Sequence, residues 1–81
     1  MDLLKGKYFH IYENGEIERQ GMVVGAVGLE YYLIQYFDFL IGEPSDMSLV
    51  TLSDISGNYK IYETAEEMRT AYERSLKHIN N

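Results

Sequence analysis

The sequence predicts an α+β domain, and three observations carry that prediction. An Asn14-Gly15 pair separates two β-rich runs, a long apolar run covers residues 29–41, and a helical pattern follows Thr64. The expected architecture is a small, strongly curled antiparallel sheet or SH3-like barrel of about five strands with one C-terminal amphipathic helix. Curling is expected because it lets a small sheet protect its edges. A flat meander with the helix on one face is the alternative.

The first two strands are expected at Lys7–Tyr12 and Ile17–Val24. Asn-Gly between two such runs is a strong hairpin signal, because both residues tolerate the positive φ angles of a tight turn. Alternation places Phe9 on one face of the first strand and His10 on the other. Gly21 interrupts the second strand and predicts a bulge or bend there.

The apolar run predicts a central strand at about Glu30–Phe37, followed by a turn or short 3₁₀ segment at about residues 38–41. Its aromatic content favours a strand over a helix. The whole run, if extended, would span roughly 43 Å, whereas a chain of this size has a diameter of about 30 Å. The strand must therefore end or bend early. Because both of its faces are apolar, we expect cover on both sides, with Leu33 in the core.

Turn-forming residues divide the segment that follows. We expect a turn at Gly42–Asp46, a fourth strand at Ser48–Leu52, a loop over residues 53–58 and a short fifth strand at Tyr59–Tyr62. Gly, Pro, Asp and Ser mark these breaks because they adopt or stabilise turn conformations.

The C-terminal helix is expected over about residues 65–79. Thr64 and Glu67 have the spacing of a capping box, in which each side chain accepts a hydrogen bond from a free backbone amide. Helical spacing then marks one buried stripe. Its members are Met68, Ala71, Tyr72, Ser75, Leu76 and Ile79.

Length and composition predict one domain over residues 1–81. The chain has a formal net charge of −6, is 46% hydrophobic and contains no cysteine. It therefore has the apolar content of a folded protein and can form neither disulfides nor thiolate metal sites. No apolar run reaches the ~18 residues that a membrane span needs. We expect a cytoplasmic protein without a membrane segment.

Catalytic signatures are absent from the sequence. His10 and His78 are the only histidines, and no local motif surrounds them. The glycines of residues 21–28 lack both the Lys-Ser/Thr end of a P-loop and the spacing of a dinucleotide-binding loop. We expect His10 to be a packed strand residue with one nitrogen bonded. The prediction is a protein that is not an enzyme, with no cofactor and no metal.

The charge pattern is more informative. No Lys or Arg lies between Gln20 and Tyr59, so the middle of the chain is negative throughout. Direct binding to nucleic acid is not expected, because such binding rests largely on Lys and Arg neutralising phosphates. The carboxylates either meet a basic groove on a partner or only keep the protein soluble. We expect Glu43, Asp46 and Asp54 to lie in loops.

Tyrosine is the other unusual feature, with eight copies in 81 residues. Some of these rings complete the core, and the rest are expected to form an aromatic surface among the carboxylates, which is typical of a protein-binding hot spot. The candidate partner-binding residues are Glu30, Asp38, Glu43, Asp46, Asp54, Tyr8, Tyr12 and Tyr36.

Several segments together are similar to those of short proteins carried by bacterial phages and plasmids. They are Gly6–His10, Gln20–Gly21, Tyr31–Gln35 with Phe37, Gly42–Ser45, and Tyr62 with Ala65–Met68. The resemblance covers most of the chain, and its motifs are structural rather than catalytic. It implies a context in which small acidic proteins act as stoichiometric inhibitors of host defence systems, anti-CRISPR and anti-restriction proteins among them.

The expected function is therefore that of a non-enzymatic acidic binding protein. It would dock on a larger protein or ribonucleoprotein complex that has a basic groove, and block it, in the cytoplasm of a bacterial host. Protein complexes that bind or process nucleic acids are the expected partner class, because they expose such basic grooves. The alternative is a small SH3-like adaptor or regulatory module that binds a peptide or forms a homodimer.

Overall fold

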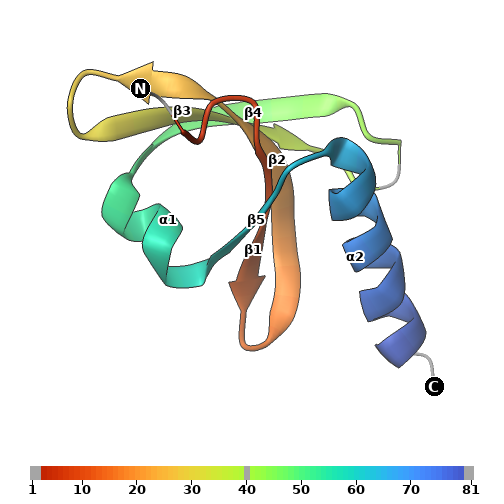
Figure 1. Ribbon diagram of the computed structural model, residues 1–81. Helices are drawn as coiled ribbons and strands as arrows, with labels where there is room; N and C mark the ends of the chain where they lie inside the picture. Colours follow the sequence, from red (N-terminus) through yellow and green to blue (C-terminus); the bar gives the residue numbers. More distant parts are fainter. Residues whose placement is uncertain (1–2, 40, 80–81) are drawn as a thin grey trace.

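Five antiparallel strands and two helices make up the fold (Figure 1). The structure is a computed structural model that describes residues 3–39 and 41–79. The elements are β1 (Tyr8–Glu13), β2 (Glu16–Val27), β3 (Tyr31–Phe37), β4 (Pro44–Thr51), α1 (Leu52–Asn58), β5 (Tyr59–Tyr62) and α2 (Ala65–Ile79). The strand order across the sheet is β4-β3-β2-β1-β5.

The predicted hairpin is confirmed. β1 and β2 pair in antiparallel fashion, and the turn between them places Asn14 at φ 53° and Gly15 at φ 80°. Positive φ at both central residues is the type I′ pattern that suits the twist of the flanking strands. The bulge or bend predicted at Gly21 does not interrupt the register there; the register of β2 shifts opposite Ile11 and Tyr12, and between Val23 and Gly25.

The sheet is open, so the predicted curled sheet or SH3-like barrel is wrong. β1 pairs with β2 as far as Met22, whereas β3 pairs with β2 from Gln20 onward. The two hairpins therefore share only a short central stretch of β2 and extend in opposite directions along it. β4 and β5 form the two opposite edges of the sheet, so the sheet does not close. The molecule measures 44 × 24 × 21 Å.

The predicted central strand exists with nearly the predicted bounds, but β2 holds the central position of the sheet. Ile34 is the residue of β3 that is fully buried, while Leu33 is half-buried on the opposite face. The expectation of cover on both sides, with Leu33 in the core, is therefore wrong. One face of β3 belongs to the main core, and the other is partly open.

A turn follows β3 directly, as predicted, but the second predicted turn at Gly42–Asp46 is cut short because β4 begins at Pro44. The turn after β3 is closed by bonds from the Asp38 amide to the Glu43 carbonyl at 2.9 Å and from the Gly42 amide to the Asp38 carbonyl at 3.0 Å. Gly42 supplies a positive φ of 71°. Pro44 is the first residue of β4. Proline has no backbone N–H to donate, and an edge strand tolerates this because its outward-facing groups have no partner in the sheet.

A second helix, α1, occupies the segment that was predicted as a loop. Thr51 caps it: the Thr51 hydroxyl accepts from the Asp54 amide at 3.1 Å, and Asp54 Oδ2 accepts from the Thr51 amide at 3.0 Å. This reciprocal pair is a complete capping box. It also ends β4 at Thr51, so Leu52 belongs to the helix.

The capped C-terminal helix is confirmed, with two corrections. The Thr64 hydroxyl accepts from the Glu67 amide at 3.1 Å as predicted, but Glu67 reaches back to the amide of Glu63 rather than of Thr64. Met68 is buried and Tyr72 half-buried, whereas Leu76 is 41% exposed, so its predicted place in the core is wrong. Ile79 has no described side chain.

The two helices pack on opposite faces of the sheet, and each covers only part of its face. On one face, Ile55 of α1 packs on a cluster formed by Phe9, Val23, Ile34 and Val50. On the other face, α2 packs on β1, β2 and β5, at one end of the sheet (Figure 1). The part of that second face formed by β3, β4 and the end of β2 lies beyond α2.

We predict that Ile34→Ala lowers the free energy of unfolding by about 2–5 kcal/mol, because it leaves a cavity in the buried cluster. The matched control is Leu76→Ala, which removes a side chain of the same size from an exposed position and should change stability by about 0.5 kcal/mol. Urea denaturation measures both values. Equal losses in the two variants would contradict the described core.

Candidate protein-binding surface

A set of apolar side chains lies uncovered on the face of the sheet that α2 only partly covers. Cross-strand partners share a face, and the register pairs Leu33 with Leu49 and Val27 with Tyr31, while Met22 and Met47 lie on either side of Gln35. Met47 is 50% and Leu49 55% exposed. We call this set the open face; it consists of Met22, Val27, Tyr31, Leu33, Met47 and Leu49.

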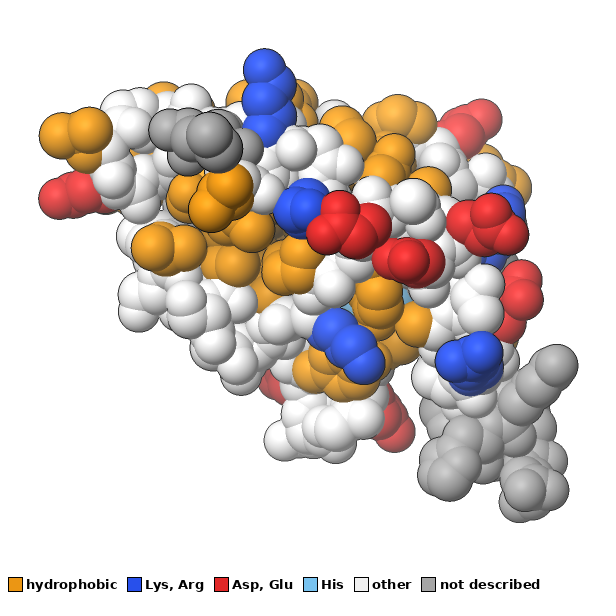
Figure 2. Space-filling view, in the orientation of Figure 1, with side chains coloured by type: hydrophobic (Ala, Val, Ile, Leu, Met, Phe, Trp, Pro, Cys, Tyr) orange, Lys and Arg blue, Asp and Glu red, His pale blue; other side chains and the backbone are white. Residues whose placement is uncertain are grey.

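Figure 2 shows hydrophobic side chains at several places along the upper edge of the molecule, together with one basic side chain. Large apolar side chains that gather on an exposed face mark candidate interaction sites.

The carboxylates of the middle of the chain are all exposed and lie around β3 and β4. We call them the acidic rim: Glu30, Asp38, Glu43, Asp46 and Asp54. The turn between β3 and β4 holds Asp38 and Glu43, and the start of β4 holds Asp46. Glu30 lies at the other end of β4, because it precedes Tyr31, which pairs with Thr51. The expectation that Asp46 and Asp54 lie in loops is wrong, since they belong to β4 and α1.

Asp54 differs from the rest of the rim because it has a structural task. Its hydrogen bonds with the backbone and side chain of Thr51 hold the pKa of Asp54 below its ordinary value. The side chain is therefore ionised at neutral pH while it caps α1. A substitution of Asp54 would change both the charge of the rim and the stability of this helix.

The three candidate tyrosines do not form one surface with the rim. Tyr36 lies on the α1 side of the sheet, edge-on to Phe9 at 6.3 Å and beneath the Arg19 guanidinium at 4.4 Å. Tyr8 lies on the opposite side and stacks on Phe37 at 6.4 Å. Tyr12 lies near β5, where its side chain contacts Tyr62. All three are half-buried.

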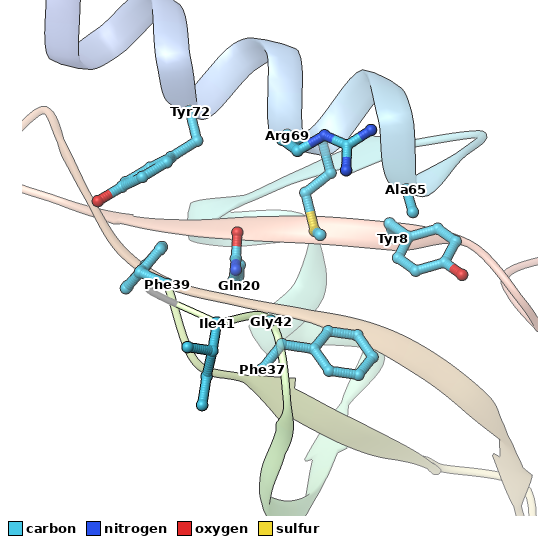
Figure 3. Close-up of a pocket in the computed structure, with 10 residues that line it drawn as sticks. Tyr8, Gln20, Phe37, Phe39, Ile41, Gly42, Ala65, Arg69 and Tyr72 are labelled. Carbon is cyan, nitrogen blue, oxygen red and sulfur yellow. The ribbon is translucent and has the colours of Figure 1, made fainter.

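A pocket of about 420 Å³ lies between α2, the strands and the turn after β3. Figure 3 shows Tyr72 and Arg69 above it on α2, with Phe37, Phe39 and Ile41 on the opposite wall. Phe39 stacks on Tyr72 at 4.7 Å. The Gln20 amide, which also lines the pocket, donates to the Asp38 carbonyl at 3.2 Å. No local sequence signal marks this pocket, because separate segments form its walls.

His10 is fully buried beneath α2 and takes part in packing, as predicted. Its Nδ1 atom is hydrogen-bonded to the Tyr62 hydroxyl at 2.9 Å, and its Nε2 atom has no hydrogen-bond partner among the described residues. Its ring packs against Tyr62 and Tyr72. Burial lowers the pKa of His10 from 6.5; the nearby Gln20 side chain opposes this shift, and Lys60 adds to it.

Residues 3–39 and 41–79 contain neither a candidate metal site nor a membrane-spanning helix. In these ranges no three His, Asp or Glu side chains come together as a metal site would require. Neither helix, as far as the described residues extend, is long and apolar enough to span a membrane.

We predict that the buried histidine makes folding stability depend on pH. Below about pH 6.5 the unfolded chain binds a proton that the folded chain resists, so the free energy of unfolding should fall as the pH drops from 7.5 to 5.5. In His10→Gln this loss should be smaller. Chemical denaturation across that range measures it, and equal losses in both proteins would show that His10 is not responsible.

Comparison of the chain with protein-family models, with curated proteins and with solved structures finds no match.

Proposed function

We propose that this chain is a non-enzymatic binding protein that docks its open face and acidic rim on a basic surface of a larger partner and blocks that surface. The observation that carries the proposal is the coincidence of the two features. The apolar side chains left uncovered by α2 and the carboxylates without basic neighbours in sequence both belong to the β3–β4 half of the molecule.

The apolar part would supply most of the affinity. Met47 and Leu49 stand half-exposed on a regular strand, and Leu33 and Tyr31 lie beside them on β3. Burial of such side chains against a partner releases ~25 cal/mol for each Å² of apolar surface removed from water. Because the strands already fix the backbone, the entropy lost on binding is that of the side-chain rotamers alone.

The acidic part would select the partner. β3, β4, α1 and the turns that join them contain no Lys or Arg. Arg19 lies over Tyr36 on the α1 side of the sheet, and Arg69 lines the pocket. A rim of one charge sign attracts a surface of the opposite sign and repels another acidic surface.

Proteins that handle nucleic acids offer the required basic surface, because they neutralise phosphates with Lys and Arg. The resemblance to proteins of phages and plasmids that the sequence suggests would imply the same partner class. We therefore infer a phage- or plasmid-encoded inhibitor that acts in the host cytoplasm on a defence complex, in the manner of anti-CRISPR proteins.

The test compares two variants of equal charge in a pull-down from bacterial host lysate. The rim variant carries Glu30→Gln, Glu43→Gln and Asp46→Asn. The matched control carries three exposed substitutions elsewhere: Glu16→Gln, Glu66→Gln and Glu73→Gln. Asp54 is left intact because it caps α1.

We expect wild type and the control to retain the same basic partner, identified by mass spectrometry, and the rim variant to lose it. Purified partner should then associate more slowly with the rim variant, and the dependence of association on salt should flatten, because three attractive charges are gone. A partner retained equally by all three proteins would refute the electrostatic part of the proposal.

A further inference from the structure

The outer edge of β4 lacks the usual protective features along most of its length. β4 has eight residues and pairs only with β3 among the described strands. Natural edge strands are usually protected by charges, prolines, bulges or short length. In β4 these devices occur only at the start, as Pro44, Asp46 and a register shift opposite Gln35–Phe37. The remaining stretch, Met47–Thr51, carries no charge and no proline.

The side chains of this stretch alternate in a way that suits an added strand. Met47 and Leu49 project on the open face, where both are about half-exposed. Val50 is buried toward α1 with the core cluster. A further strand laid along β4 would therefore find apolar neighbours at every second position on the open face.

Acidic side chains lie near both ends of the β4 edge. Glu43 and Asp46 lie at its start, and Glu30 and Asp54 at its finish, all exposed. A second copy of this chain, paired antiparallel along β4, would place acidic groups against acidic groups at both ends. Like charges that face each other across strands are destabilising. The edge therefore suits a segment that is basic at its ends.

We propose that β4 is a strand-addition site for an extended segment of the partner, apolar at alternate central positions and basic at both ends. Main-chain hydrogen bonds along β4 would provide affinity. Contacts of the partner's side chains with the open face and the acidic rim would provide specificity. This inference rests on the proposed function and specifies how the partner is bound.

The test uses three end-blocked synthetic peptides with the ¹⁵N-labelled full chain. The first is Lys-Lys-Val-Thr-Val-Thr-Lys-Lys. The second, Lys-Lys-Val-Pro-Val-Pro-Lys-Lys, keeps its charge but lacks two backbone donors. The third, Glu-Glu-Val-Thr-Val-Thr-Glu-Glu, keeps the strand pattern and reverses the charge. Amide chemical shifts report both the affinity and the site.

We expect the first peptide to shift amides of Met47–Thr51. The second should bind with an affinity at least about tenfold lower, because hydrogen bonds to the edge are lost. The third should not bind. Equal binding of the two lysine peptides would overturn strand addition while leaving the proposed electrostatic docking intact. Absence of binding by the first peptide would also overturn strand addition, and the lysate experiment still judges the proposed function separately.

Two further measurements locate the site on the chain. Met47→Lys with Leu49→Lys should abolish peptide binding in a protein with a folded spectrum, whereas Leu76→Lys, at an exposed position of α2, should bind as wild type does. Sedimentation of the unliganded wild type should show a monomer. A dimer with protected β4 amides would overturn the inference in favour of a second copy.

Discussion

The close approach of Phe9 to the backbone at Gly21 is the contact on which the rest of the sheet depends. A Cβ atom at position 21 would lie 2.7 Å from Phe9 Cζ and would collide with the Gln35 carbonyl oxygen. Only glycine leaves this space free. Phe9 can therefore lie across β2 and reach the centre of the buried cluster.

Gly21 also lies where the two hairpins overlap. It pairs with Phe9 on one side and with Tyr36 on the other, so β1 and β3 both contact β2 there. Beyond this point the hairpins run in opposite directions, which makes the sheet long and open. One short helix covers the shared core, and α2 covers only the β1–β5 end. The open face is a direct result of this arrangement.

Local signals predicted much of the fold, because they act within a few residues. Asn14-Gly15 fixed the first turn, and Thr64 with Glu67 fixed the start of α2. The same reasoning could have found α1, since Thr51 and Asp54 have the spacing of a capping box. The openness of the sheet could not be predicted in this way, because it depends on which part of β2 each neighbour pairs with.

The candidate surface was predictable in part for the same reason. The absence of Lys and Arg from the middle of the chain is visible in the sequence, and the carboxylates there are indeed exposed. The open face was missed, because the exposure of Met47 and Leu49 depends on where α2 stops covering the sheet. The half-buried rings of Tyr8, Tyr12 and Tyr36 show that aromatic content alone does not separate core from surface.

The central claim is that the β4 side of the sheet is the surface that meets a partner. Hydrogen–deuterium exchange of the free protein and of its complex with the captured partner tests this most directly. The account predicts slower exchange in residues 44–51 on binding, with α2 unchanged. Slower exchange confined to α2 and to residues 37–42 around the pocket, with β4 unchanged, would contradict it.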